Sequence, residues 1–130
     1  MKATKLFYGH DSDSMIMIKK DKVEIDTWTN DLEYINEELE YLLDIEDRML
    51  NNAILYQELQ TLSKENILNL RALYHYKDDV RNAIECDTVE YDDLYLGKHE
   101  KNRKLYLEHK EKYRNLISKV LSSILLVTKD

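Results

Sequence analysis

Residues 24–44, EIDTWTNDLEYINEELEYLLD, decide the fold class of this chain. Their apolar residues recur at spacings of 3, 4, 3, 4 and 3, namely Ile25, Trp28, Leu32, Ile35, Leu39 and Leu42. This period places one apolar stripe along a helix, with acidic side chains mostly away from it. We predict a helix over about residues 22–48. Its start is left open, because residues 15–18 fit either a further helical turn or a short extended segment.

A second helix is predicted over about residues 52–85. Its apolar stripe consists of Leu55, Leu59, Leu62, Leu70, Leu73, Val80 and Ile84. Asn51 and Asn52 supply capping or turn chemistry between the first two helices. A break at residues 61–66 is the alternative, since Ser63 could cap a new helix there. We favour the earlier break, because it gives helices of more nearly equal length.

The third helix is predicted to follow a capping box, in which Asp87 and Glu90 have the required spacing. A heptad seam then alternates spacings of 4 and 3 through Tyr95, His99, Asn102, Tyr106, His109, Tyr113, Leu116 and Val120. Gly97 lies off this seam and marks a kink, the true helix start or a tolerated interruption.

These elements predict an all-α, elongated, antiparallel three-helix bundle with up-down-up order and coiled-coil-like packing. Two glycines and no proline disfavour β-rich folds, which need frequent turns. We expect one bundle domain over residues 22–130, with residues 1–21 as a short N-terminal extension packing on it. The predicted core includes Trp28, Leu32, Ile35, Leu39, Leu73, Val80, Leu116 and Val120.

Charge is distributed unevenly along the chain. Residues 24–47 hold ten acidic residues and no lysine or arginine, whereas residues 98–130 hold nine basic and four acidic residues. The first and third helices run parallel in an up-down-up bundle, so we expect them to pair, with the acidic flank facing Lys101, Lys104, Lys112 and Arg114. The alternatives are a basic surface for RNA or lipid and a charged face for a protein partner.

Composition excludes several classes of function. The net charge of −7 argues against general nucleic-acid binding. The single cysteine, Cys86, excludes an intrachain disulfide framework, and no apolar run approaches the length of a membrane span. Without a recognisable secretion signal, a cytoplasmic location is expected. No histidine has a glutamate three residues before it, as di-iron bundles require, and no phosphate loop or catalytic serine motif occurs.

One set of possible metal ligands remains after these motifs are excluded. In a hairpin that turns near residue 87, His75 and His99 lie at equal height, and Asp79 is one turn from His75. Two imidazoles and a carboxylate can hold a transition metal. Because His75 is predicted to point off the seam, solvent-facing or hydrogen-bonded histidines are favoured, and no metal or cofactor is expected. The ten tyrosines indicate a thin core that reaches solvent or, alternatively, a ligand groove.

The last turns of the third helix are apolar around more than one face. Leu116, Ile117, Val120, Leu121, Ile124, Leu125, Leu126 and Val127 exceed the stripe that one core can cover. We predict a homodimer through Ile117, Leu121 and Leu125. The alternative cover is the N-terminal segment, through Leu6, Phe7, Tyr8 and residues 15–18.

The sequence therefore predicts a non-catalytic cytoplasmic protein that acts through protein contacts, as an adaptor or self-assembling unit. The alternative function is a small-ligand or metal-binding bundle that uses His75, His99 and nearby tyrosines.

Overall fold

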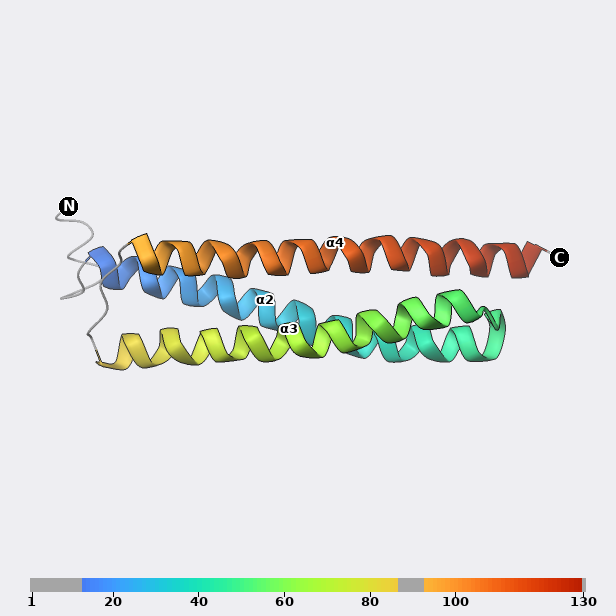
Figure 1. Cartoon of the computed structure of the whole chain (residues 1–130), viewed down its shortest axis with the longest axis horizontal. Helices are drawn as coiled ribbons and strands as arrows, with labels where there is room; N and C mark the ends of the chain where they lie inside the picture. The colour runs from blue at the N-terminus through green and yellow to red at the C-terminus, as the bar shows by residue number, and fades with distance from the viewer. Residues whose placement is uncertain (1–12, 87–92, 130) are drawn as a thin grey trace.

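The computed structural model describes residues 13–86 and 93–129, and within them every residue except Asn51 and Asn52 is helical. Helix α2 spans Asp13–Ile45 and continues into η1, a π-helical turn at Glu46–Leu50. Helix α3 spans Ala53–Cys86, and α4 spans Asp93–Lys129. Figure 1 shows the three long helices side by side along the molecule, with α3 antiparallel to the other two. This confirms the predicted three-helix bundle.

The first helix begins before the predicted start at about residue 22. Residues 13–21, assigned from sequence to an N-terminal extension, form the first turns of α2. The reason is that the apolar stripe continues backward: Ile18 lies one heptad before Ile25, and both are fully buried. Residues 1–12 and the capping box at residues 87–90 lie outside the described residues.

The turn between α2 and α3 lies at the earlier of the two predicted positions. Asn51 has a left-handed backbone (φ 47°, ψ 48°), and its N–H donates to the Glu46 carbonyl at 2.8 Å. Asparagine tolerates this conformation better than most residues. The Asn52 Oδ1 atom accepts a hydrogen bond from the Leu55 N–H at 3.1 Å and caps α3. Residues 61–66 therefore stay within one continuous helix, as Gly97 does in α4.

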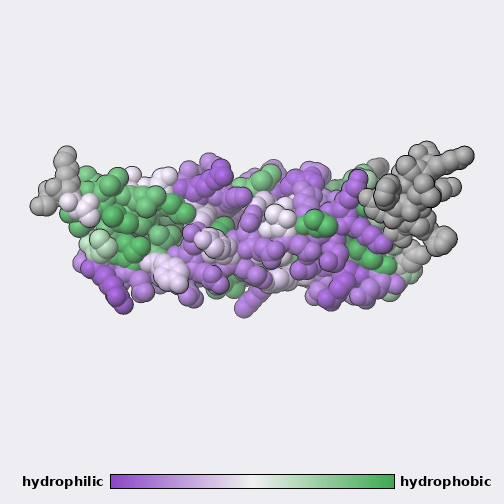
Figure 2. All heavy atoms as spheres, turned by 180° about the vertical axis from the view of Figure 1, so that it is seen from behind, coloured by the Kyte–Doolittle hydropathy of each residue, from purple (hydrophilic) through white to green (hydrophobic). Residues whose placement is uncertain are grey.

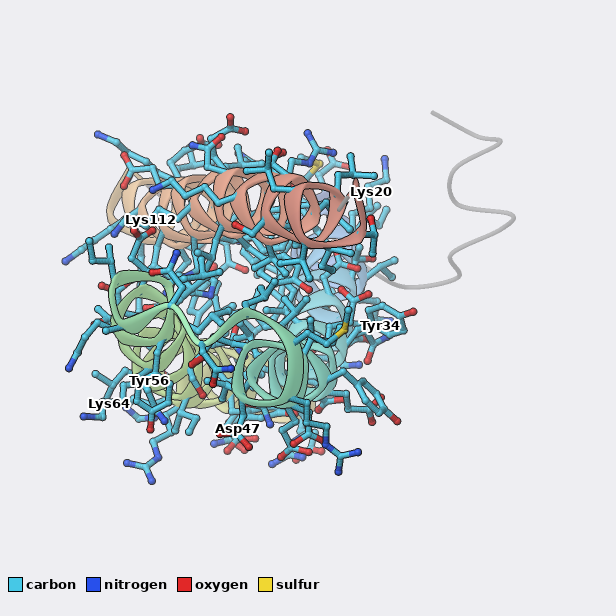
Figure 3. The ribbon with its side chains drawn as sticks, turned by 90° about the vertical axis from the view of Figure 1, so that its right-hand side faces the viewer. Lys20, Tyr34, Asp47, Tyr56, Lys64 and Lys112 are labelled. Atoms are coloured by element: carbon cyan, nitrogen blue, oxygen red, sulfur yellow. The ribbon has the colours of Figure 1, made fainter. Side chains whose placement is uncertain are left out.

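The core consists of two apolar clusters that follow one another along the axis of the bundle. The first surrounds Trp28 and Leu73, and the second surrounds Leu39 and Leu59. All eight residues predicted for the core are buried, namely Trp28, Leu32, Ile35, Leu39, Leu73, Val80, Leu116 and Val120. Figure 3 views the bundle end-on, with Tyr34 and Tyr56 pointing outward from α2 and α3. The helix phases predicted from periodicity are therefore confirmed.

Candidate functional site

His99 lies in an aromatic enclosure near the start of α4 and is 2% exposed. Its ring stacks on Trp28 with centroids 5.1 Å apart and on Tyr95 with centroids 6.5 Å apart. The Tyr76 ring, from α3, lies 5.7 Å away at an interplanar angle of 47°. Aromatic residues from all three helices thus fix the plane of this imidazole.

Both ring nitrogens of His99 are in polar contact. Nδ1 lies 2.7 Å from the Tyr76 hydroxyl, and Nε2 lies 2.7 Å from Glu24 Oε1. The Oδ1 atom of Asp21 is 3.5 Å from the same Nε2. One ligand atom from each of Asp21, Glu24 and His99 lies within 4.8 Å of the other two. We call these three residues the His99 cluster.

Arg103 lies one helical turn after His99 and donates two hydrogen bonds to the Glu24 carboxylate. Its Nε donates to Oε2 at 2.9 Å, and its Nη2 donates to Oε1 at 2.7 Å. The Arg103 guanidinium, aided by His99, lowers the pKa of the Glu24 carboxyl below its ordinary value and outweighs the opposing effect of burial. Glu24 is therefore a charged carboxylate that joins α2 to α4.

The contact between α2 and α4 repeats every seven residues. His99 meets Glu24, Tyr106 donates to Asp31, and Tyr113 donates to Glu38, each pair being 75 positions apart. A cation follows one turn later in the first two repeats, since Arg103 pairs with Glu24 and Lys110 with Asp31. Ile117 takes that place in the third repeat. Burial, with the Glu38 charge, raises the pKa of the Tyr113 hydroxyl strongly, so it remains a donor.

Basic side chains of α4 pair with acidic side chains of α2, as predicted, but they are not the basic residues that the sequence analysis named. Arg103 and Lys110 provide the cations toward α2. Lys112 pairs instead with Glu65 of α3 at 3.5 Å, and Lys104 pairs with Glu108 of its own helix at 3.9 Å. Because α4 packs on both α2 and α3, its basic side chains divide between two neighbours. Sequence alone did not show on which side each one lies.

His75, Asp79 and His99, the candidate metal ligands that the sequence analysis disfavoured, do not come together as one group. His75 is exposed, and Asp79 forms a salt bridge with Lys98 at 3.2 Å. The buried stripe of α3 runs through Leu73, Tyr76 and Val80, so Tyr76 is the residue that reaches His99. The expected position of His75 off the seam is confirmed by its exposure, but the sequence analysis did not identify Tyr76 as the residue of α3 that faces His99.

Asp21 and Glu24 are the partners that the sequence analysis missed. Both lie on α2, outside the hairpin formed by α3 and α4, and Asp21 falls within the segment assigned to an extension. The seven-residue spacing of Glu24, Asp31 and Glu38 matches that of His99, Tyr106 and Tyr113. An alignment of these two series in parallel would have paired each acidic residue of α2 with its partner on α4.

A second buried polar group separates the two apolar clusters. Asn66 of α3 is fully buried, and its Nδ2 donates to the Leu32 carbonyl of α2 at 2.9 Å. Its Oδ1 lies 2.7 Å from Nε2 of His109, which is 2% exposed on α4. The Oδ1 atom of Asn66 has no hydrogen to donate, so it accepts a hydrogen bond from His109, whose proton is therefore on Nε2. This pair links all three helices at one level and specifies their register.

Acid should destabilise the protein through His109. Burial, together with Lys112, lowers the pKa of His109 below 6.5 and outweighs the opposing Glu65 charge. The unfolded state then binds more protons than the folded state below about pH 6.5. The free energy of unfolding should therefore fall as pH decreases from about 6.5 toward the folded-state pKa, which urea denaturation at several pH values measures.

His109→Gln should weaken this pH dependence. The side-chain amide of the introduced glutamine can still donate a hydrogen bond to Asn66, but it does not titrate. The matched control is His75→Gln, which replaces an exposed histidine on α3 and should keep the wild-type profile. An unchanged profile in His109→Gln would contradict the assignment.

The end of the bundle where α4 terminates exposes large apolar side chains. We call this surface the apolar end, and it consists of Met49, Ile54, Leu121, Leu125, Leu126 and Val127. Figure 2 shows apolar residues gathered there, and Figure 1 shows α4 running past the turn between α2 and α3. Of the three residues predicted for a dimer interface, Leu121 and Leu125 are 53% and 69% exposed, whereas Ile117 is half-buried against the second core cluster.

Residues 15–18, one alternative cover for this surface, lie at the opposite end of the bundle (Figure 1). Because α2 and α4 are parallel, the start of α2 packs near the start of α4. Met15, Ile16 and Ile18 are themselves buried there. Leu6, Phe7 and Tyr8 lie outside the described residues.

Comparisons with known proteins do not assign the chain to a group. No family model, curated protein or solved structure matches it. Within residues 13–86 and 93–129, no helix combines the length and apolar character required to cross a membrane.

Proposed function

We propose that this chain is a non-catalytic helical protein that acts through protein contacts, and that the partner at its apolar end is a second copy of itself. The observation that carries this proposal is the exposure of Val127. It lies one heptad after Val120, which is fully buried, and yet it is 46% exposed. Val127 continues the core-facing seam of α4 beyond the point where α2 and α3 turn, so its own bundle leaves it uncovered.

The chemistry of the last turns favours a second copy over a charged partner. Residues 120–128, VLSSILLVT, contain no charged side chain, although charged residues make up 35% of the chain. Two copies can therefore approach without like-charge repulsion, and the small side chains of Ser122 and Ser123 permit close approach. Leu125 and Leu126, 69% and 70% exposed, supply the apolar area. A two-fold pair in which each apolar end covers the other is the commonest closed arrangement.

Other contacts support a structural use of the polar groups. The hydrogen bonds of Glu24, Asn66 and Tyr106 connect one helix to another. We also propose a cytoplasmic location, since Cys86 is an exposed free thiol, and free thiols are typical of reducing compartments.

A charge placed in the apolar end should prevent dimerisation. Leu125→Glu removes an apolar side chain from both halves of a two-fold interface and puts a carboxylate there. A buried leucine contributes about 1.5–3 kcal/mol, so the dissociation constant of the dimer should rise by at least about 100-fold. Light scattering coupled to size exclusion measures the mass, and circular dichroism checks that the helices persist.

The matched control is Leu107→Glu, because Leu107 is 54% exposed on α4 but lies outside the apolar end. It should remain dimeric. Loss of the dimer in both variants would point to general charge effects. A dimer that survives Leu125→Glu would place the interface elsewhere and contradict the proposal.

A further inference from the structure

We propose that the His99 cluster is a binding site for one divalent transition metal ion of the zinc type, held by Asp21, Glu24 and His99. This inference is independent of self-association, because the cluster lies near the start of α4 and the apolar end lies at its other terminus (Figure 1). The donor set is one imidazole nitrogen and two carboxylate oxygens. Zinc and related borderline ions accept this combination, whereas magnesium and calcium prefer oxygen donors alone.

The geometry places the donors at nearly metal-binding separations. Nε2 of His99 is 2.7 Å from Glu24 Oε1 and 3.5 Å from Asp21 Oδ1. Zinc lies about 2.0–2.2 Å from such atoms, so ligand atoms around it are separated by roughly 3–3.5 Å. Small side-chain movements bring the three atoms to those distances. The ion then takes the place of the proton that Nε2 shares with Glu24, and the neutral imidazole carries that proton on Nδ1 instead.

The surroundings of the cluster match those that orient metal ligands. From Nδ1 the ring N–H donates a hydrogen bond to the Tyr76 hydroxyl oxygen, 2.7 Å away. Arg103 holds both oxygens of Glu24, with Nε 2.9 Å from Oε2 and Nη2 2.7 Å from Oε1. The ion would occupy the lone pair of Oε1 that now accepts from His99 Nε2. Hydrogen bonds of this kind fix the tautomer of a ligating histidine and the orientation of a ligating carboxylate. Trp28 and Tyr95 hold the ring by stacking.

Charge and topology favour a cation at this position. Arg103 pairs with Glu24, while Asp21 adds a second carboxyl group beside His99. With both carboxyl groups ionised and His99 neutral, these four side chains are net negative. Asp21 and Glu24 are three residues apart on α2, whereas His99 belongs to α4. A bound ion therefore joins two helices and stabilises the folded state. Three protein ligands leave at least one coordination position for water.

Cobalt titration of the full chain tests the site. The chelator-treated protein is titrated with Co²⁺, whose visible absorption reports its coordination, and Zn²⁺ is then added as a competitor. We expect saturation at one equivalent and displacement by zinc. Asp21→Asn and His99→Gln should abolish binding. Tyr76→Phe should weaken it by about 10–100-fold, the usual effect of losing a hydrogen bond to a ligand.

Two controls distinguish this site from adventitious binding. His75→Gln removes an exposed histidine, and Cys86→Ser removes the exposed thiol. Both variants should bind like the wild type. If His99→Gln fails to fold by circular dichroism, the nearly isosteric Asp21→Asn decides the question. Absence of saturable binding, its survival in Asp21→Asn, or its loss in either control would overturn the proposal.

Discussion

Leu39→Ala is expected to lower the free energy of unfolding by about 2–5 kcal/mol, the usual cost of truncating a core leucine. Leu39 is fully buried in the second core cluster, where α2 packs against Leu59 of α3 and Val120 of α4. Removal of its isopropyl group leaves a cavity that three long helices cannot close without moving relative to one another. Urea denaturation followed by circular dichroism measures the change, at one protein concentration because association also contributes to stability.

Leu107→Ala is the matched control, since Leu107 is 54% exposed on α4. Its change should stay within about 0.5 kcal/mol, as for most surface substitutions. If Leu39→Ala cost no more than this control, the buried face of α2 would be assigned incorrectly.

Asn66→Ala is expected to cost about 1–3 kcal/mol, because it leaves the buried His109 N–H without its acceptor. Asn66 provides both hydrogen bonds of the polar level, one to the Leu32 carbonyl and one to His109. A hydrogen bond between buried groups contributes modestly, but an unpaired buried donor bears its full desolvation cost. Loss of this pair should also weaken the register of the bundle, which a broader thermal transition would report.

The control for this change is Asn82→Ala, an exposed asparagine on the same helix. It should leave stability nearly unchanged. If the two substitutions changed the free energy of unfolding equally, the hydrogen bonds of the buried Asn66 amide would contribute nothing to stability beyond the difference in helix propensity.

The number of helices and their buried faces could be predicted because both depend on local periodicity. The stripe from Ile25 to Leu39 and the seam from Tyr106 to Val120 fix which side of each helix is buried. Asn51 and Asn52 likewise have turn preferences that act within a few residues. Such signals are present in the order of residues, whatever the neighbouring helices do.

The partners of each polar side chain could not be predicted in the same way. His75 and Tyr76 are adjacent in sequence, but only Tyr76 lies on the side of α3 that faces His99. Lys112 and Arg103 are both on α4, yet one pairs with α3 and the other with α2. These choices depend on how each helix is rotated about its axis, which is set by packing of all three helices together. Periodicity shows which face of a helix is buried, but it does not show which of the two neighbouring helices a polar side chain beside that face will contact.

Two copies of the chain should associate through the apolar end, and the mass of the wild-type chain in solution tests this association most directly. Sedimentation equilibrium from low to high micromolar concentration compares the observed mass with the 15.6 kDa of one chain. We predict a rise to twice that value as concentration increases, with no further increase, because a two-fold interface is closed. A mass that stays at 15.6 kDa over the whole range would contradict the claim.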